Sequence, residues 1–163
     1  MTGRIVSLQE ARAMRERVAS QGGKVVFTNG CFDLLHVGHV RCLKEARRQG
    51  DLLIVGLNDD QSTRRLKGPR RPFMVQEDRA EIVAALEHVD CVVLFSEATA
   101  ERLVSSLKPD VYVKGGNYAV EELPEAKVVA EYGGKVHLTS VTQGHSTTDL
   151  ISTIVAHHQG ERR

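Results

Sequence analysis

Short apolar runs alternate with amphipathic stretches along most of the chain. The runs Leu52-Leu53-Ile54-Val55 and Cys91-Val92-Val93-Leu94 are apolar at consecutive positions, which is typical of strands buried on both faces of a sheet. Between such runs, apolar residues recur every three or four positions, as they do on one face of a helix. We expect strands at residues 24–28, 52–57, 91–95, 111–113 and 135–138, and helices at residues 8–21, 37–49, 75–87, 99–107, 121–132 and 146–158.

The alternation of strands and helices is the order found in parallel α/β sheets. We therefore expect an open, Rossmann-like sheet of five parallel strands with helices on both faces. Ser7 and Glu10 have the spacing of a capping box, which predicts where the first helix begins. Because no repeat or low-complexity linker interrupts the chain, residues 1–163 are expected to form a single domain, with an N-terminal helix at about 8–21 and a core at about 23–158.

Composition narrows the classes of protein to which the chain can belong. The net charge is +1, from 22 basic and 21 acidic residues, so a polycation that binds nucleic acid indiscriminately is excluded. Cys31, Cys42 and Cys91 are widely spaced and form no Cys-x-x-Cys pair, which argues against a disulfide framework or a zinc ribbon. The N-terminus lacks the apolar core of a signal peptide, and no apolar stretch approaches the ~20 residues of a membrane span. These features predict a cytoplasmic protein without a membrane or nucleic-acid partner.

Residues suited to an anionic ligand follow several predicted strands, at the edge of the sheet where ligands of parallel α/β folds bind. They carry glycine, histidine, lysine or hydroxyl groups. These segments are the run from Phe27 to His39, the basic irregular segment 58–72, Lys114-Gly115-Gly116-Asn117-Tyr118, and Ser146-Thr147-Thr148. Together they predict one crevice for a phosphate-bearing ligand.

His36 and His39 lie three residues apart at the start of a predicted helix. This spacing lets both imidazoles point toward an anion at the helix N-terminus, and each can donate a hydrogen bond to a phosphate oxygen. Gly38 leaves room for the ligand. The alternatives are a helix cap with histidines facing solvent, or a zinc pair, although no third ligand of suitable spacing is evident.

The same residues carry a resemblance to a known superfamily. The segment from Thr28 to His39, with His36-Val37-Gly38-His39 at its end, resembles the HxGH signature of nucleotidyltransferases, and Ser146-Thr147-Thr148 resembles their second signature. Within the superfamily the chain is similar to D-glycero-β-D-manno-heptose 1-phosphate adenylyltransferases, free-standing or as the C-terminal domain of a bifunctional ADP-heptose synthase. This resemblance covers residues 4–154. It includes Arg65-Leu66-Lys67-Gly68, Arg71-Pro72, Glu77-Asp78-Arg79, Lys108-Pro109-Asp110 and Lys114-Gly115-Gly116-Asn117-Tyr118.

The resemblance implies a reaction and its substrates. AMP would pass from ATP to a sugar 1-phosphate, giving ADP-heptose and pyrophosphate for cell-surface carbohydrate such as lipopolysaccharide. Mg²⁺ would arrive with the nucleotide, and no resident metal site is expected. The protein would act on small molecules as a homo-oligomer, by analogy a dimer. Since Met1 directly precedes the similar region, we expect the free-standing form or a piece of the longer one.

Roles for individual residues follow from the resemblance and from their chemistry. His36, His39 and Lys67 are the expected catalytic residues. Nucleotide binding is expected of Thr28, Asn29, Gly30, Phe32, Gly38, Lys114, Gly115, Gly116, Ser146, Thr147, Thr148 and Arg79. Binding of the sugar phosphate is expected of Asp33, Lys44, Asn117 and Tyr118.

Several of these residues have a second interpretation that the sequence leaves open. Ser146 with Asp149 three residues later is also an ordinary helix cap. Arg79 reaches phosphates or forms an ion pair with Glu77 or Glu81. Lys44 is equally consistent with a helix surface, and the basic segment around Lys67 with a solvated charge run. The glycines after Lys114 are also consistent with a plain turn, and Asp33 with fixing a loop through backbone amides.

Two positions depart from the family pattern, and they bear on the acceptor. Asn117 stands where family members usually have Asp, and His145 where they commonly have Cys. These departures make the acceptor less certain than the type of reaction.

Two rival functions are open alternatives to the adenylyltransferase. One is a cytidylyltransferase acting on glycerol 3-phosphate or a related phospho-alcohol, and the other is a regulatory module that binds nucleotide without turnover.

Overall fold

The computed structural model describes residues 3–116, 118–140 and 146–160, within which six parallel strands form one sheet. The strands are β1 (Arg4–Ile5), β2 (Val25–Gly30), β3 (Leu52–Asn58), β4 (Cys91–Phe95), β5 (Val111–Gly115) and β6 (Lys135–Thr139). The predicted parallel α/β architecture is confirmed, but the predicted number of five strands is wrong. The additional strand is β1, which is too short to show a period and is defined only by its pairing with β4.

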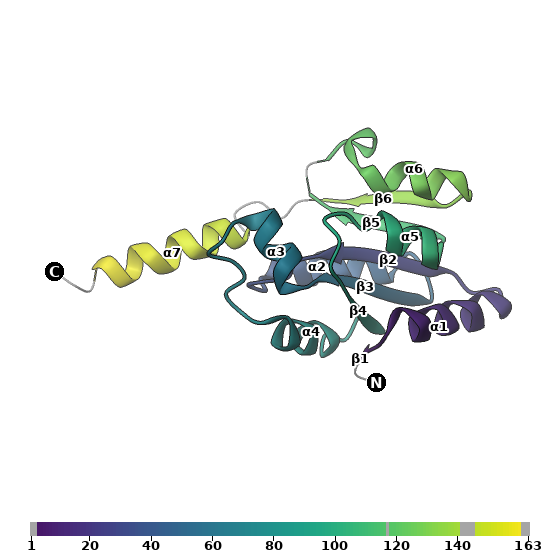
Figure 1. The fold of residues 1–163 in the computed structure, drawn as a ribbon, viewed down its shortest axis with the longest axis horizontal. Helices are drawn as coiled ribbons and strands as arrows, with labels where there is room; N and C mark the ends of the chain where they lie inside the picture. The colour runs from purple at the N-terminus through teal and green to yellow at the C-terminus, as the bar shows by residue number, and fades with distance from the viewer. Residues whose placement is uncertain (1–2, 117, 141–145, 161–163) are drawn as a thin grey trace.

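Helices cover both faces of this sheet (Figure 1). They are α1 (Leu8–Ser20), α2 (Val37–Arg47), α3 (Asp60–Lys67), α4 (Gln76–Ala84), α5 (Glu101–Leu107), α6 (Pro124–Glu131) and α7 (Thr147–Gly160), with a 3₁₀ turn at Val120–Glu122. Side chains of β2 alternate between the two cores. Val25 and Phe27 pack with α1, α5 and α6, whereas Val26 packs with α2 and α4.

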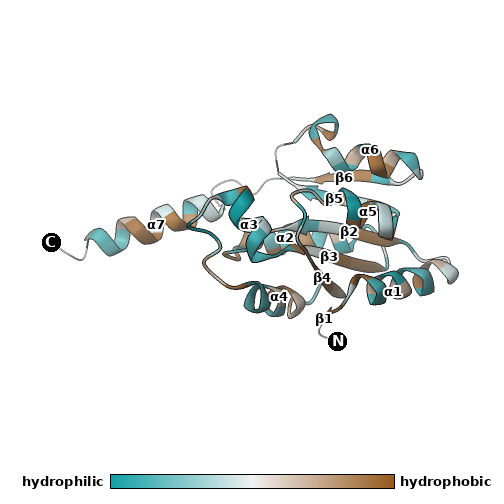
Figure 2. Cartoon of the chain, viewed as in Figure 1, coloured by the Kyte–Doolittle hydropathy of each residue, from teal (hydrophilic) through white to brown (hydrophobic). Residues whose placement is uncertain are grey.

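The buried strands are the most apolar part of the chain. In Figure 2 the central strands β2, β3 and β4 are largely brown, while the helices around them carry hydrophilic positions. All seven residues of β3 are buried, as the continuous apolar run predicted. Among the described residues, no helix is long and apolar enough to span a membrane.

The strand order β1-β4-β3-β2-β5-β6 places a topological switch between β2 and β5. From β2 the chain proceeds outward through β3 and β4, and then crosses to the other side of β2 to form β5. Loops that follow β2 and β5 therefore diverge to opposite faces and leave a crevice at the carboxyl ends of these two strands. Ligands of open α/β sheets bind at such a point.

Two predicted boundaries are wrong in ways that matter for the site. Residues 58–72 were expected to be irregular, but α3 occupies Asp60–Lys67. Its buried residues are Ser62 and Thr63, so the helix shows no apolar period to signal it. The helix expected at residues 121–132 is divided into the 3₁₀ turn and α6, because Pro124 occupies the first turn of α6.

Candidate active site

A cleft of about 560 Å³ opens at the carboxyl ends of β2 and β5. Most of the residues predicted from the sequence line it. They are Thr28, Asn29, Gly30, Phe32, His36, Gly38, His39, Lys67, Lys114, Gly115, Gly116, Tyr118, Ser146 and Thr147. The fold therefore brings together four segments that are far apart in the chain.

The histidine pair forms the N-terminus of α2. A tight turn precedes it, in which Phe32 has a left-handed backbone with φ of 48° and its ring lies 5.3 Å from the ring of His39. His36 is the N-cap residue, and its Nδ1 accepts the N–H of Gly38 at 3.1 Å. The Nδ1 of His39 accepts the N–H of His36 at 3.3 Å. The two imidazoles thus cap the helix reciprocally, as one interpretation expected, but both are half-buried and line the cleft.

These backbone contacts determine which nitrogen of each imidazole carries the proton. Because Nδ1 accepts an N–H in both rings, the neutral tautomer of each places its proton on Nε2. Burial, and then the nearby His36, lower the pKa of His39 from 6.5 to about 4. His39 is therefore a neutral N–H donor at physiological pH.

Asn29 lies near the end of β2 and lines the cleft. Its Oδ1 accepts the hydroxyl of Tyr112 at 2.7 Å and the ammonium of Lys114 at 3.3 Å. Burial lowers the pKa of Lys114, and the positive charge of Lys67 lowers it further, whereas Glu125 opposes both effects. Lys67 is thus close enough to Lys114 for its charge to act on it, and both lysines line the cleft.

Helix α3 carries Lys67 to the cleft. Asp59 caps this helix by accepting the N–H of Ser62 at 2.6 Å. Lys67 is the last residue of α3 and is exposed, with its side chain in the cleft lining. Part of the segment expected to be irregular is thus a short helix, which determines where this lysine lies.

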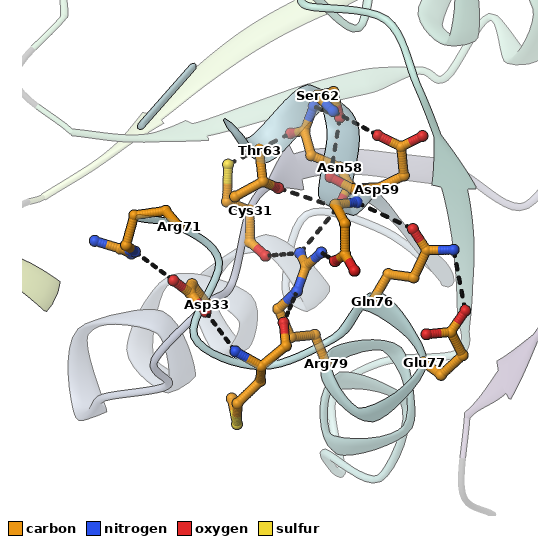
Figure 3. A network of polar contacts seen from close by, with 12 residues as sticks. Cys31, Asp33, Asn58, Asp59, Ser62, Thr63, Arg71, Gln76, Glu77 and Arg79 are labelled. Atoms are coloured by element: carbon orange, nitrogen blue, oxygen red, sulfur yellow. Dashed lines mark hydrogen bonds and ion pairs between the residues drawn. The ribbon is translucent and has the colours of Figure 1, made fainter. Parts of the chain in front are cut away.

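Arg79 does not line the cleft, although nucleotide binding was expected of it. It is fully buried, and Figure 3 shows its guanidinium surrounded by protein acceptors. It donates to Asp60 Oδ1 at 2.7 Å, to the carbonyl of Asn58 at 2.8 Å, to the carbonyl of Met74 at 3.0 Å, and to the carbonyl of Cys31. The expected ion pair with Glu77 or Glu81 is wrong, because α3 supplies Asp60 as the partner instead.

Asp33 has the loop-fixing role that the sequence left open. It is buried, and its Oδ1 accepts the N–H groups of Phe73 at 2.7 Å and Met74 at 3.2 Å. Arg71 pairs with its other oxygen (Figure 3). Asp33 does not line the cleft, so the structure holds the segment before α4 with this carboxylate rather than offering it to a ligand.

The glycines that follow Lys114 accommodate protein side chains. A Cβ on Gly115 would lie 2.9 Å from Sγ of Cys42, and a Cβ on Gly116 would collide with the ring of Tyr118. Gly116 has φ of +139°, which disfavours any other residue. The space next to these glycines is thus occupied by the side chains of Cys42 and Tyr118. Both side chains line the cleft themselves.

The start of α7 closes the cleft beside the histidines. Ser146 Oγ accepts the N–H of Asp149 at 3.0 Å, and Asp149 accepts the N–H of Ser146 at 3.1 Å, which confirms the predicted cap. Thr147 Oγ1 donates to the carbonyl of Leu34 at 3.5 Å, next to the histidine pair. Thr148 is exposed and is not part of the lining.

The structure places only one of three further predicted positions. Lys44 is exposed on α2 and does not line the cleft, so the helix-surface interpretation describes it. Asn117 and His145 lie outside the described residues. In the part of the chain that the structure describes, no group of three His, Cys, Asp or Glu side chains is placed to hold a metal ion.

The sequence did not indicate twelve of the residues that line the cleft. Six of them come from the loop after β4 and from the segment that leads into α6, and the other six lie in or next to β2, β3, β6, α2 and α3. The missed lining residues are Cys31, Cys42, Asn58, Leu66, Ala98, Thr99, Glu122, Leu123, Pro124, Glu125, Thr139 and Ser140. A signal was present in Pro124-Glu125, because a proline followed by an acidic residue marks a helix start, here after the end of β5.

Comparison with known proteins places these features in a family. A family described as cytidylyltransferase-like matches residues 27–153, which include the histidine pair and Ser146-Thr147-Thr148. A bifunctional protein HldE of Syntrophotalea carbinolica is 49% identical over 155 residues, which are 94% of this chain and 32% of the relative. A bifunctional protein HldE of Geobacter sulfurreducens is 54% identical over 136 residues, which are 83% of this chain and 28% of the relative. The chain thus spans about a third of the length of these relatives.

Solved structures agree with the sequence comparisons. A lipopolysaccharide core biosynthesis protein from Thermoplasma volcanium is 30% identical with a TM-score of 0.60, over 74% of this chain and 98% of that one. A pantoate-β-alanine ligase from Francisella tularensis, at 13% identity and a TM-score of 0.61 over 88% of this chain and 68% of that one, is similar in fold alone. The resemblance drawn from the motifs is confirmed, and the chain belongs to the cytidylyltransferase-like family.

Proposed function

We propose that this chain is an adenylyltransferase that moves AMP from ATP to D-glycero-β-D-manno-heptose 1-phosphate, with ADP-heptose and pyrophosphate as products. The observation that carries this proposal is the convergence of His36, His39, Lys67 and Lys114 on one cleft at the switch point of the sheet. The relatives named bifunctional protein HldE, and the structure titled lipopolysaccharide core biosynthesis protein, support a sugar phosphate as the acceptor.

The triphosphate of ATP lies along the N-termini of α2 and α7. The Nε2–H groups of His36 and His39 donate to it, and the α2 dipole favours its charge. Ser146 and Thr147 face the same region from the start of α7 and bind the outer phosphates. Since His39 is neutral, it acts as a fixed donor whose strength does not change over the physiological pH range.

The acceptor phosphate lies between Lys67 and Lys114. One of its oxygens attacks the α-phosphorus of ATP while the bond from that phosphorus to the bridging oxygen breaks. Pyrophosphate leaves with the electron pair, so no covalent intermediate with the protein is needed. The protein aligns the two phosphates and stabilises the charge that develops on the departing pyrophosphate.

Mg²⁺ is carried by ATP in this proposal. The cleft lining holds cations, amides and hydroxyls at its phosphate end and no cluster of carboxylates among the described residues, which fits a metal held by phosphates and water. Tyr118, whose ring lies exposed against Gly116, covers the base. The use of ATP is consistent with a cytoplasmic reaction.

A substrate matrix tests the proposal. Pyrophosphate release is measured for ATP, CTP, GTP and UTP, each against heptose 1-phosphates, glycerol 3-phosphate and other phosphate acceptors. We expect turnover with ATP and heptose 1-phosphate. Turnover with CTP and glycerol 3-phosphate alone would establish the rival cytidylyltransferase. Nucleotide binding without pyrophosphate release from any pair would establish the regulatory module.

A further inference from the structure

Glu125 is a buried carboxylate in a cleft that otherwise favours anions. It lies in the first turn of α6, is 3% exposed and is part of the cleft lining. Its Oε1 accepts the N–H of Ala100, the residue before α5, at 2.8 Å. One backbone amide does not require a charged acceptor, and burial of a carboxylate is costly unless other groups use its charge.

Glu125 acts on two polar neighbours, because its negative charge adds to the effect of burial in raising the pKa of Tyr112 and opposes the lowering of the pKa of Lys114 by burial. An ionised carboxylate offers about four acceptor sites, and one of them is used by Ala100. Burial, followed by the negative charge of Glu125, raises the pKa of Tyr112 well above its ordinary value. The hydroxyl of Tyr112 in turn donates to Asn29, so Glu125 and Asn29 flank the same hydroxyl group.

Asn29 complements this carboxylate with a donor. Two donors, the hydroxyl of Tyr112 and the ammonium of Lys114, converge on its Oδ1 and fix the orientation of the amide. Within the described part of the chain, the amide nitrogen of Asn29 donates to no protein acceptor, and Asn29 lines the cleft. Asn29 and Glu125 thus lie near the same tyrosine and both line the cleft, and an N–H donor and a carboxylate acceptor match the chemistry of a hydroxyl group, which both accepts and donates.

The position of Glu125 separates it from the triphosphate groups. His36 and His39 belong to α2 on one face of the sheet, whereas α5 and α6 pack on the opposite face. A carboxylate next to the triphosphate would repel it, but Glu125 lies on the other side of the strand ends. In an in-line transfer the acceptor approaches the α-phosphate from the side opposite to the leaving pyrophosphate.

We propose that Glu125 and the amide nitrogen of Asn29 form a hydroxyl-binding subsite that holds the acceptor sugar phosphate by its hydroxyl groups. This inference rests on the proposed function and extends it to the recognition of the sugar. The subsite lies at the α5 and α6 end of the cleft and makes Glu125 a specificity-determining residue. A phospho-alcohol with fewer hydroxyl groups gains less from it than a heptose does.

The test compares Glu125→Gln with Glu121→Gln. The glutamine at position 125 keeps an oxygen for the N–H of Ala100 and removes the charge, so the fold is preserved. Glu121 is exposed in the 3₁₀ turn before α6, lies outside the cleft lining and provides the same change of charge four residues earlier in the chain. Steady-state pyrophosphate release gives the KM for heptose 1-phosphate and for ATP. Calorimetry with α,β-methylene ATP, alone and followed by heptose 1-phosphate, gives both affinities without turnover.

We expect Glu125→Gln to lower kcat/KM for heptose 1-phosphate about 10- to 100-fold, with unchanged ATP affinity and an unchanged melting temperature. Glu121→Gln should resemble the wild type. Loss of ATP affinity with unchanged sugar-phosphate affinity would overturn the subsite in favour of the ribose hydroxyls of the nucleotide. Equal affinities in both variants would overturn it entirely. Absence of turnover in the wild type would count against the proposed function alone, because calorimetry still measures the sugar phosphate.

Discussion

The imidazole rings of His36 and His39 lie ring against ring, with centroids 3.9 Å apart. Each ring has its Nδ1 engaged by a backbone N–H at the start of α2. Both side chains therefore cap the helix through Nδ1, and in the proposed mechanism it is Nε2–H that donates to the triphosphate. The cap and the proposed catalytic donor cannot be separated by alanine substitution, but they can be separated by asparagine.

Asparagine at position 39 should preserve the fold and abolish most turnover. Its Oδ1 can replace Nδ1 as the acceptor for the N–H of His36, but it offers no donor at the position of Nε2. We expect His39→Asn to lower kcat about 10²- to 10³-fold with a melting temperature close to that of the wild type. His39→Ala should lose activity and helix stability together. Pyrophosphate release and thermal unfolding measure the two effects, and full turnover in His39→Asn would contradict the assigned role.

The lowered pKa of His39 predicts a loss of stability in acid. The unfolded chain protonates this imidazole near pH 6.5, whereas the folded protein does so only near pH 4. Between these values the unfolded state binds more protons, so the free energy of unfolding decreases as the pH falls. The loss attributable to His39 reaches about 3 kcal/mol by pH 4.

Urea unfolding at about pH 7.5 and about pH 4.5 checks this prediction, with His39→Asn as the comparison. The wild type should lose more stability than His39→Asn over this range. His88→Asn removes an imidazole outside the cleft lining and serves as the control. Equal losses in the wild type and His39→Asn would show that His39 titrates normally in the folded state.

Local signals in the sequence predicted the parts of the site that depend on neighbours in the chain. Ser7 with Glu10 and Ser146 with Asp149 form the capping boxes that their spacing indicated. The start of α2 at Val37 also follows from the turn before it. Each of these features is stabilised by residues within one helical turn. The spacing of those residues in the sequence is therefore enough to predict where the helix begins.

Features that depend on distant partners were not predictable in the same way. Arg79 bonds to Cys31 and to the stretch that holds Asn58 and Asp60, and nothing next to it in the sequence indicates these partners. Glu125 enters the cleft because α5 and α6 pack side by side. Strand β1 exists only through its register with Cys91 and Val92. Tertiary packing decides such positions, and a single sequence does not display it.

The buried guanidinium of Arg79 should be essential for stability rather than for chemistry. Arg79→Met would leave Asp60 without its ion-pair partner and would remove the guanidinium N–H groups that the carbonyls of Cys31, Asn58 and Met74 accept. We expect a decrease of about 3–5 kcal/mol in the free energy of unfolding, measured with urea. Arg64→Met, on the exposed side of α3, should change it by less than about 0.5 kcal/mol. Similar stabilities for the two variants would contradict the network of Figure 3.

Lys67 should affect activity without affecting the fold. Its side chain is exposed in the cleft at the end of α3, so removal of its charge leaves no buried group unpaired. Lys67→Gln is expected to lower kcat/KM about 10- to 100-fold, as for loss of a charged hydrogen bond to phosphate, with an unchanged melting temperature. Arg64→Gln removes the same charge from the same helix and should retain activity. Comparable losses in both variants would indicate only a general electrostatic effect.

Gly116 and Gly68 provide a matched pair that tests how firmly Tyr118 is placed. Both have a positive φ, +139° and +99°, so alanine strains the backbone at either position. At Gly68 a Cβ meets nothing within 4 Å, whereas at Gly116 it collides with the Tyr118 ring.

We expect Gly68→Ala to cost about 1–2 kcal/mol of stability and to leave ATP affinity unchanged. Gly116→Ala should displace the ring from the cleft and weaken ATP binding at least about 10-fold, as for loss of base stacking. Calorimetry with α,β-methylene ATP measures this difference, and equal affinity in the two variants would remove Tyr118 from the nucleotide site.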